Sequence, residues 1–523
     1  MQFIPKSLLR NLYNRSSLRN TSDGVRLSIK NRLAPAILKS LDRIALNGRQ
    51  IPLTQVSLQF ESGLRRNADE LGKDKAVEFS MGTLMNIEIA TDSLPPGEHE
   101  IDLEFTVEPF GRLELKLKDQ LNTGQRDPDA IPRNHQDDYS EEIVTARRDF
   151  VEQKSACKLD HITRPSFDPH VTRGNIENFT GVAQIPLGIA GPLKIHGEHA
   201  NGEFYVPLAT TEGTLVGSYN RGMKVIAQSG GVTCAVVGDN MQRAPVFGFE
   251  SAGQARAFAD WLVANMDHLK EVCRESDPFV NLKYIDYYLA SRFVYTRFNF
   301  TTGDAAGMNM VGKATFAACN WILANYREAE VRDFFLEANL ATDKKASMIN
   351  TMRTRGKRVT AECTVKREVL QQIMDADTEQ LYRHAGIANV GSMLSGANNN
   401  GCHAANAITA MFIATGQDVA NVAESSTGIL YTELTEDKDL YISITLPSLI
   451  VATVGGGTGL PTQNEALQIM DCAGVGKVHK FAEIVAGTVL AGEISLAAAI
   501  SSLDWVSSHD QYGRNDPNKV NKT

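Results

Sequence analysis

The chain of 523 residues carries a formal net charge of -9 and has a pI of about 5.7, so it lacks the basic excess with which proteins meet a phosphate backbone, and nucleic-acid binding is excluded. Its length allows about three domains, and its ordinary aromatic content excludes a disordered chain. Scattered cysteines without a Cys-x-x-Cys pair indicate neither a disulfide framework nor a metal site, and no apolar run of about 18 residues predicts a membrane span, so we expect a cytoplasmic protein.

The first part of the chain, residues 1–120, is rich in segments that alternate apolar and polar residues. Its first 22 residues carry cations and no acid, which suits either an organelle presequence or a short docked helix around Leu9. The segment Glu108-Pro-Phe-Gly111 predicts a hairpin between two such runs. We predict an antiparallel β-sandwich with a structural or oligomer-forming role, built from strands at 25–29, 56–60, 77–79, 85–89, 101–107 and 113–117.

A polar stretch at residues 121–140 predicts a linker, and a helix is expected from Glu141 to Lys158. Residues 179–193 then alternate apolar residues with turns. His196 and His199 follow in a glycine-containing hairpin turn. Because further metal ligands are missing there, we interpret this turn as solvated.

Glu212 stands between a turn and a helix in the stretch 206–224. We expect Thr210 or Thr211 to act as N-cap and the helix to begin near Glu212. One face is predicted to be buried, while the other combines small residues with cations, which suits either a ligand phosphate or a solvated basic surface. The predicted buried stripe consists of Leu215, Val216, Tyr219, Gly222, Met223 and Ile226.

Residues 244–336 have a different character. A helix is expected at 255–272, a strand at 293–300, a glycine-containing turn at 303–310 and a further helix through Tyr326. A strand, a glycine turn and a helix can receive a dinucleotide pyrophosphate on helix amides. The spacing is not GxGxxG, so a Rossmann fold is not indicated.

Two polar or small-residue segments follow. Residues 339–345 hold adjacent lysines, and residues 390–403 form a predicted loop that leads into a helix at 403–418. Asp418 lies at the end of this helix, where the helix dipole disfavours a carboxylate, so a local reason for it is expected. The predicted buried stripe of the helix consists of Ile408, Met411, Phe412 and Thr415.

The end of the chain contains another glycine-rich loop, residues 455–459, between an apolar strand at 440–454 and a helix. The last helix is expected at 482–507. His509 follows it at the edge of a tail rich in helix breakers, where a histidine is either simply exposed or carried on a mobile lid.

Eight short motifs follow one another between residues 140 and 510. They are Glu177-Asn-Phe-Thr-Gly181, Pro186-Leu-Gly-Ile-Ala-Gly-Pro192, Ala209-Thr-Thr-Glu-Gly213, Asp304-Ala-Ala-Gly-Met-Asn-Met310, Thr342-Asp-Lys-Lys345, His403-Ala-Ala-Asn406, Gly416-Gln-Asp418 and Thr453-Val-Gly-Gly-Gly-Thr458. With them the chain resembles the hydroxymethylglutaryl-coenzyme A reductase family of the biosynthetic, class I type. The membrane anchor of animal and fungal members is not found, and the β-rich first domain lies outside the family pattern, so we expect a soluble member with an extra N-terminal domain.

The resemblance implies an α+β multidomain protein. A substrate and dimerisation domain of α/β type, at 141–243 and 337–510, would be interrupted by a small ferredoxin-like cofactor domain at 244–336 and followed by a flexible tail at 511–523. The family forms homo-oligomers with active sites between subunits, and no nucleic-acid or membrane partner is expected. It reduces a thioester to an alcohol by two hydride transfers from dissociable NADPH or NADH, through a hemithioacetal and an aldehyde.

Four residues match the catalytic positions of the family. Lys344 would stabilise the oxyanion that hydride addition creates, an effect of about 3 to 4 kcal/mol per donor in comparable sites. Glu212 would supply protons to the carbonyl oxygen, assisted by like-charge coupling to Asp418. His509 would protonate the departing coenzyme A thiolate.

Further residues match substrate and cofactor positions of the family. The substrate-binding positions are Arg243, Asp343, Lys345, Ser218, Asn220, Arg221, His403 and Asn406. The cofactor-binding positions are Asp304, Gly307, Met308, Asn309, Gly456 and Gly457.

Several family positions are altered. Glu337 replaces a serine that touches the acyl carboxylate, and Ile387 replaces a lysine of the acyl pocket. The pocket becomes more negative by two units, so a different acyl group is an alternative. Asp277 and Pro278 replace a Ser-Arg pair that holds the 2′-phosphate of NADP, which favours a free ribose hydroxyl and therefore NAD. Asn515 replaces the serine that regulates animal enzymes, so that switch is not expected.

The main hypothesis is therefore reduction of 3-hydroxy-3-methylglutaryl-CoA to mevalonate. The same chemistry on another acyl-CoA or carrier-bound thioester is the nearest alternative, and a non-catalytic scaffold is an alternative of another class. Retention of Glu212, Lys344, Asp418 and His509 argues against the scaffold. The choice between NADP and NAD, the oligomer size and the direction of flux stay open.

Overall fold

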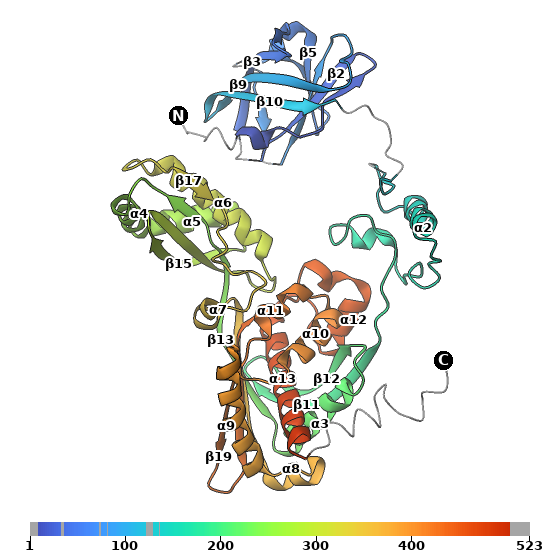
Figure 1. Ribbon diagram of the computed structural model, residues 1–523, viewed down its shortest axis with the longest axis vertical. Coiled ribbons are helices and arrows are strands. Elements are labelled where there is room, and N and C mark those ends of the chain that lie inside the picture. The colour runs from blue at the N-terminus through green and yellow to red at the C-terminus, as the bar shows by residue number, and fades with distance from the viewer. Residues whose placement is uncertain are drawn as a thin grey trace. The chain divides into compact units, whose positions relative to one another are not determined.

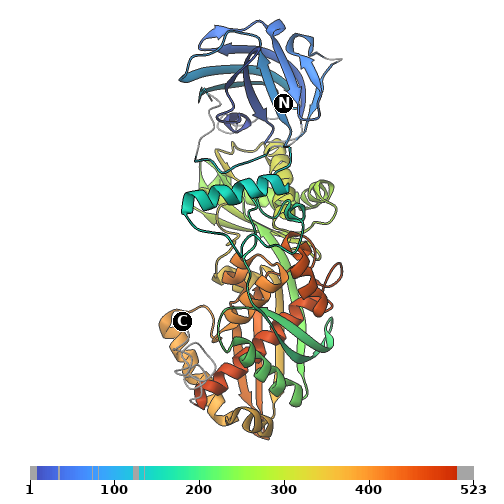
Figure 2. The same ribbon diagram turned by 90° about the vertical axis from the view of Figure 1, so that its right-hand side faces the viewer.

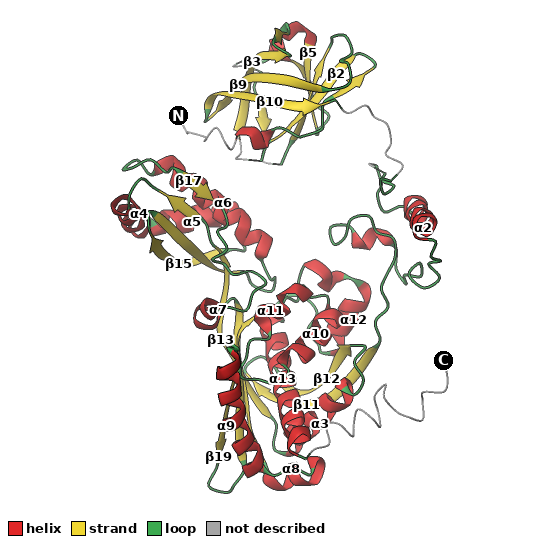
Figure 3. Cartoon of the chain, in the orientation of Figure 1, coloured by secondary structure: helices red, strands yellow, loops and turns green. Residues whose placement is uncertain are grey.

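The computed structural model describes residues 9–502 except 33–35, 73–74, 81, 122–128 and 135. The chain divides into two compact units, one of residues 1–130 with 319–327 and the other of residues 131–318 with 328–523. Figure 1 follows the chain through its elements, and Figure 3 separates helices from strands. His509 and the tail lie outside the described residues.

The N-terminal unit contains two antiparallel sheets with the strand orders β1-β2-β8-β5-β6 and β10-β9-β3-β4, with β7 paired to β3 (Figure 1). Every second residue of β5 and β8 is buried, which is the alternation that predicts these strands, and the β-rich character of this region is confirmed. One apolar core joins both sheets and includes the wholly buried Leu27, Leu58 and Leu103. The strands are β1 Arg19–Thr21, β2 Gly24–Lys30, β3 Ala36–Leu46, β4 Arg49–Gln50, β5 Val56–Phe60, β6 Arg65–Asn67, β7 Val77–Phe79, β8 Leu84–Ile89, β9 Glu98–Glu108 and β10 Gly111–Gln120.

Strand β3 does not bury every second residue. Its buried residues Leu38, Leu41 and Ile44 recur every third position, a spacing that also occurs in helices. The pairing of β3 with β9 shifts register twice along this stretch. Each bulge adds one residue, so the next inward position comes one residue later than alternation predicts.

The second unit is organised around one large sheet with the order β17-β14-β16-β13-β18-β20-β19. The first part of β13 pairs with β18, and its last residues, Met241 to Arg243, pair with β16, so β13 runs from the larger group of strands into the smaller one (Figure 1). Arg243 therefore lies where the two groups meet. The strands are β11 Leu187–Gly197, β12 Asn201–Ala209, β13 Val232–Arg243, β14 Val246–Gly248, β15 Asn281–Ala290, β16 Phe293–Thr301, β17 Asp333–Phe335, β18 Gly356–Val365, β19 Ile429–Leu434 and β20 Leu440–Leu449.

Helix α13, Val478–Ser501, is the central helix of this unit and crosses the sheet against β13, β18 and β20 (Figures 1 and 2). It is long and apolar enough to pass for a membrane span, but 78% of the apolar window is buried within the protein, as in a core helix. The other helices are α2 Glu141–Ser155, α3 Leu215–Gln228, α4 Ala252–Ala264, α5 Met266–Ser276, α6 Met308–Asn325, α7 Met348–Arg353, α8 Arg367–Met374, α9 Thr378–Ser395, α10 Ala404–Thr415, α11 Val422–Ser425 and α12 Pro461–Ile469.

Two predicted helix boundaries are wrong. Helix α3 begins after Thr214, which has φ 71° and makes no side-chain cap, so Glu212 lies in the turn before the helix. The loop predicted at 390–403 begins only at Gly396, because α9 continues to Ser395 and ends on that glycine in the left-handed conformation. In addition, the helix predicted at 255–272 is interrupted at Asn265, where α4 ends and α5 begins.

Candidate active site

Lys344 and Asp418 form an ion pair, with 2.9 Å between Nζ and Oδ2. Lys344 lies in a left-handed turn with φ 58°. Asp418 caps a 3-10 helix, Val419–Asn421, by accepting a hydrogen bond from the amide of Ala420 at 3.1 Å. This N-terminal cap is the local reason for a carboxylate after α10, because Asp418 belongs to the next helical turn rather than to the end of α10.

The electrostatics of the pair keep Lys344 charged. The hydrogen bond that Lys344 donates to Asp418 raises the pKa of Lys344 above its usual range, with smaller help from the charges of Asp343 and Glu424. The side chain of Lys344 is still 44% exposed. A protonated and accessible ammonium group therefore lies in this loop at neutral pH.

Glu212 lies exposed in the turn between β12 and α3, where its amide donates to Thr210 Oγ1 at 3.0 Å. Both carboxylate oxygens lie 3.4 Å from Nδ2 of Asn406 in the first turn of α10. These distances are long for hydrogen bonds, so Asn406 orients Glu212 only loosely and leaves it free to meet a ligand.

Helix α10 separates the Glu212–Asn406 contact from the Lys344–Asp418 pair within one chain. Asn406 lies near its beginning, whereas Asp418 follows its end at Thr415. Nine residues of helix correspond to roughly 13 Å at about 1.5 Å per residue. The structure thus presents two separate clusters of predicted site residues, one with Glu212 and Asn406 and the other with Lys344 and Asp418, and each is called a half-site from here on as a name only.

Three further predicted residues gather around Lys344. Arg243 lies 4.0 Å from Asp343 and donates to the carbonyl of Met308 at 3.0 Å. Lys345 is exposed, and its Nζ donates to the carbonyl oxygen of Asp343 at 3.1 Å. Arg243 and Lys344 are thus paired with carboxylates, whereas the exposed Lys345 bonds a carbonyl oxygen and offers its charge to an anionic ligand.

The predicted coenzyme A contacts on α3 are engaged within the protein. Ser218 and Arg221 both hydrogen-bond Ser495 of α13, at 2.9 Å and 3.2 Å. Asn220 accepts from the amide of Gly191 at 3.0 Å. These polar groups connect α3 to its neighbours, so their role toward a ligand stays a prediction.

His403 also has a local role, because it is the N-cap residue of α10. Its amide donates to the buried Glu493 at 2.9 Å, and its ring stacks on Tyr219 with 5.4 Å between centroids. Nε2 of His403 is buried without a hydrogen-bond partner among the described residues. His403 therefore keeps one unused polar atom beside the first half-site.

The two predicted cofactor loops lie side by side. The carbonyl oxygen of Asp304 accepts from the amide of Thr453 at 2.9 Å, and a Cβ atom added to Gly416 would collide with the backbone of Gly457. Loop 303–307 therefore meets loop 453–459, which in turn packs against the segment that carries Asp418.

Not every predicted cofactor residue is free to bind. The Asp304 carboxylate accepts three amides at the start of α13, from Gly476, Lys477 and Val478, at 2.8 to 3.1 Å. Gly307 is required by packing, because a side chain there would collide with Thr302.

Other positions in these loops leave room for a ligand. Gly303 and Gly456 have no heavy atom within 4 Å of an added Cβ, which leaves space for close approach of a cofactor. Met308 and Asn309 open α6, whose first amides suit a pyrophosphate. The open glycines and the first amides of α6 therefore suit contacts between the protein backbone and a dinucleotide.

The altered family positions have defined surroundings. Glu337 accepts a hydrogen bond from the amide of Ala244, next to Arg243, at 3.2 Å. Ile387 is 62% exposed on α9. Asp277 ends α5 and accepts from the amide of Phe279 at 3.1 Å, and Pro278 between them is exposed.

Two residues beneath the Lys344 loop were missed by sequence reasoning. Arg355 and Glu424 are both wholly buried, and both contact the Asp343–Lys344 segment. A sequence signal exists for Glu424, because it is the acid in an otherwise small and apolar run six residues after Asp418.

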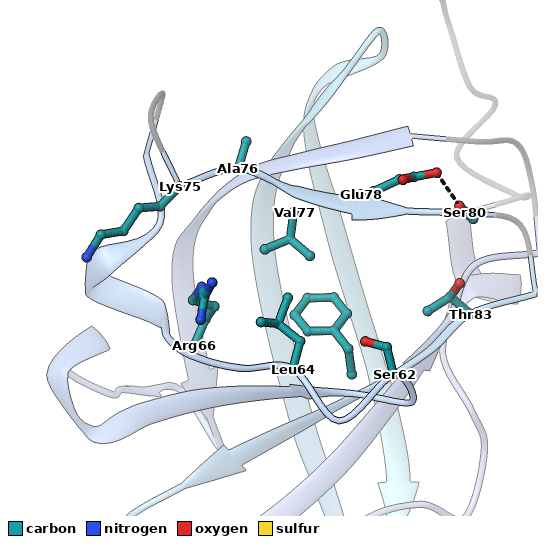
Figure 4. A pocket seen from close by; sticks show the side chains of 10 residues that line it. Ser62, Leu64, Arg66, Lys75, Ala76, Val77, Glu78, Ser80 and Thr83 are labelled. Carbon is teal, nitrogen blue, oxygen red and sulfur yellow. Dashed lines mark hydrogen bonds between the residues drawn. The ribbon is translucent and has the colours of Figure 1, made fainter.

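A cavity of about 480 Å³ lies in the N-terminal unit (Figure 4). Its wall includes the buried Phe60 and Val77, with Arg66 and Lys75 at one end. It contains none of the predicted site residues.

Comparison with known proteins identifies the family. A family model described as hydroxymethylglutaryl-coenzyme A reductase matches residues 143–514, and one described as the N-terminal domain of hydroxymethylglutaryl-CoA reductase matches residues 8–122. The expectation that the first domain lies outside the family is therefore wrong.

Curated relatives carry the same family name. The chain is 45% identical over 377 residues to the 3-hydroxy-3-methylglutaryl-coenzyme A reductase of Methanothermobacter thermautotrophicus, covering 72% of this chain and 94% of the relative. It is 40% identical over 380 residues to the protein of that name from Zea mays, covering 70% and 65%.

A solved structure shares the fold. The class II 3-hydroxy-3-methylglutaryl-CoA reductase of Streptococcus pneumoniae, bound to NADPH in open conformations, matches with a TM-score of 0.52 and 19% identity over 67% of this chain and 92% of that one. The family match over most of the chain and these identities establish that the chain belongs to the hydroxymethylglutaryl-coenzyme A reductase family.

Proposed function

We propose that the protein reduces 3-hydroxy-3-methylglutaryl-CoA to mevalonate and coenzyme A with two molecules of NADPH or NADH. The observation that carries this proposal is the ion pair between Lys344 and Asp418, which presents a charged ammonium group beside Arg243 and Lys345. The relatives bear the name of this activity at 40 to 45% identity. Turnover by the purified protein tests the proposal, and Lys344→Ala is expected to abolish it.

The residues of this chain have distinct tasks in the reaction. Lys344 would donate to the carbonyl oxygen as negative charge develops on it, and its pairing with Asp418 keeps it protonated for this role. Glu212, loosely held by Asn406, would deliver protons to the resulting alkoxide. His509, outside the described residues, would protonate the thiolate of coenzyme A.

The cofactor would lie along the adjoining loops 303–310 and 453–459, and when bound it supplies the hydride. Asp277 favours NADH, because a carboxylate accepts from a free ribose hydroxyl and repels a 2′-phosphate. The ratio of kcat/KM for NADH and NADPH tests this preference. An Asp277→Ser variant should move the ratio toward NADPH.

The functional unit is proposed to be a homo-oligomer whose sites combine the Glu212 half of one protomer with the Lys344 half of another. The separation of these halves by α10 supports this arrangement. The end of α9 also exposes apolar side chains that suit a protomer contact, including Met393 at 81% and Leu394 at 84% exposure.

Complementation tests the shared site. Co-expressed Glu212→Gln and Lys344→Ala chains should recover about one quarter of wild-type activity in a dimer, because half the dimers are mixed and each of these has one intact site. Lys344→Ala with Asp418→Asn is the matched control, since both changes fall in one half-site and no activity should return. If neither mixture recovered activity, each site would lie within a single protomer.

A different acyl thioester is the second candidate, and Glu337 favours it. Its carboxylate is turned to the amide of Ala244, beside the cation Arg243 that would hold a substrate carboxylate. Glu337→Ser with Ile387→Lys should raise turnover of 3-hydroxy-3-methylglutaryl-CoA if the pocket is altered. No gain in the double variant would remove this candidate.

The finer assignments of the family resemblance are part of the proposal. They are a class I enzyme in the cytoplasm, an α/β substrate domain at 141–243 and 337–510, and a ferredoxin-like cofactor domain at 244–336. The long strand β13, which passes between the two groups of strands and ends at Arg243, supports the division at this point.

A further inference from the structure

The loop that carries Lys344 is unusual in its backbone. Asn339, Thr342 and Lys344 all have positive φ, at 62°, 54° and 58°. Non-glycine residues rarely adopt this conformation, and it persists only where surrounding groups enforce it. Specific contacts must therefore hold Lys344 in this turn.

Glu424 holds the turn through the backbone of Lys344. Its Oε1 accepts a hydrogen bond from the Lys344 amide at 3.0 Å, and its side chain is wholly buried. Glu424 lies in α11, six residues after Asp418. One short segment thus supplies both the carboxylate that pairs with the Lys344 ammonium and the carboxylate that fixes the Lys344 backbone.

Arg355 completes this arrangement from below. Its guanidinium is wholly buried and reaches Oδ1 of Asp343 at 2.6 Å and Oε1 of Glu424 at 3.4 Å. It also donates to the carbonyl of Gln242, next to Arg243, at 3.3 Å. Arg355 therefore links the Lys344 loop, the Asp418 segment and the end of β13.

The other side of the loop is held by Asn350, which itself accepts a hydrogen bond from the wholly buried Arg297 at 2.7 Å. Asn350 accepts from the Thr342 hydroxyl at 2.7 Å, and its amide nitrogen lies 3.3 Å from the carbonyl oxygens of Thr342 and Lys345. A buried charge therefore supports both sides of the loop. Glu424 differs from Arg297 because it bonds the backbone of Lys344 directly.

We propose that Glu424, supported by Arg355, is a positioning residue that fixes the Lys344 backbone so that its ammonium meets Asp418 and points into the site. This inference rests on the proposed role of Lys344 in the reduction. A buried ion pair is weak evidence for stability, because apolar residues of similar volume often serve as well. The buried Arg355–Glu424 pair is therefore better explained by the orientation of Lys344 than by stability.

The chemistry of Glu424 agrees with this role. Burial raises its pKa, although the Lys344 amide and Arg355 favour the charged form. Oε2 has no hydrogen-bond partner among the described residues. Only one oxygen is therefore used, and it is the one that meets both Lys344 and Arg355.

The test compares Glu424→Ala with Glu424→Gln. The alanine removes the acceptor, and kcat should fall about 10²-fold with KM nearly unchanged, as for a misplaced catalytic group. Glutamine keeps the accepting oxygen and puts its NH₂ where Oε2 makes no bond, so most of kcat should return. A fall of kcat at temperatures where Glu424→Ala is still folded is the result that a purely structural loss would not give, and rescue by glutamine assigns this fall to the accepting oxygen.

Glu483 of α13 provides a matched control. It is wholly buried, accepts the amides of His199 and Ala200 at 3.0 and 2.6 Å, and also has one unpartnered oxygen. Glu483→Ala should lower thermal stability as Glu424→Ala does but leave kcat intact below the unfolding temperature. Equal losses of kcat in both alanine variants would overturn the proposal.

A second readout does not depend on turnover. Trace acetylation followed by mass spectrometry compares the reactivity of Lys344 with that of exposed Lys224. Lys344 should be protected by Asp418 in the wild type, and Glu424→Ala should raise its relative reactivity several-fold. An unchanged ratio in folded protein would contradict the proposal.

The two readouts separate the possible failures. If the wild type does not reduce 3-hydroxy-3-methylglutaryl-CoA, the proposed function fails while the acetylation ratio still decides the position of Lys344. If Glu424→Ala does not fold, Glu424→Asp replaces it, because it keeps a charge for Arg355 but is one methylene too short for the Lys344 amide. It should then show the same rise in reactivity.

Discussion

Replacing Asp418 by Asn separates stability from catalysis. Two unit charges 2.9 Å apart interact by about 1.4 kcal/mol in bulk water and by about 6 kcal/mol at an effective dielectric of 20. The side chains of Lys344 and Asp418 are 44% and 36% exposed, however, and exposed pairs contribute only about 0.2 to 1 kcal/mol. We therefore expect Asp418→Asn to change the free energy of unfolding by less than about 1 kcal/mol.

The effect on the rate should be much larger. Loss of one preorganised charged donor costs about 10²- to 10³-fold in kcat in comparable sites, and Asp418→Asn leaves Lys344 without the group that orients it. Asp418 also raises the pKa of Lys344, so in the variant the ammonium loses its proton at lower pH. The alkaline limb of kcat should therefore move to lower pH.

The assay is steady-state oxidation of NADPH or NADH from about pH 7 to 11, a range that includes the ordinary pKa of lysine, with thermal unfolding measured on the same samples. The matched control is Glu379→Gln, because Glu379 and Lys438 form a pair of similar length and exposure, 2.7 Å with 45% and 53%. It should leave both kcat and its pH profile unchanged. A kcat of Asp418→Asn within about threefold of the wild type would refute the reasoning.

Two further predictions concern stability. His170 lies between Asp137 at 2.9 Å and Asp168 at 2.6 Å, and these hydrogen bonds raise its pKa. Its contribution to the free energy of unfolding is therefore complete below about pH 6.5 and is lost as the pH rises through the raised pKa. His170→Gln should lower Tm more at pH 6 than at pH 9, and equal shifts would contradict this. Gly222→Ala on α3 should destabilise the protein by about 1 to 3 kcal/mol, because the added Cβ would collide with the backbone of α13. Gly217→Ala on the same helix meets open space and should stabilise the protein by about 0.5 to 1 kcal/mol. Thermal unfolding of both variants checks this contrast.

Sequence patterns predicted most elements of the N-terminal unit, because its strands bury every second residue. Strand β3 was missed, since two bulges turn this alternation into a spacing of three. The end of α9 was also misjudged. Small residues such as Gly391 and Ser392 suit a loop by composition, but the helix continues to Gly396, where a left-handed residue ends it.

The candidate site was only partly predictable. Motif resemblance singled out Lys344 and Asp418, and the structure brings them together. No local pattern could show that Arg355 and Glu424 lie beneath them, because this contact joins segments far apart in the chain. Nor could the sequence show that α10 holds Glu212 and Asp418 at opposite ends, which depends on how the helix packs.

The most direct test of the proposed function is the stoichiometry of the reaction. The purified protein is incubated with 3-hydroxy-3-methylglutaryl-CoA and either NADPH or NADH, while cofactor oxidation, free thiol and mevalonate are followed. Two cofactor molecules oxidised for each thiol released, with mevalonate as product, is the predicted result. Folded protein that oxidises neither cofactor with this thioester would contradict the account.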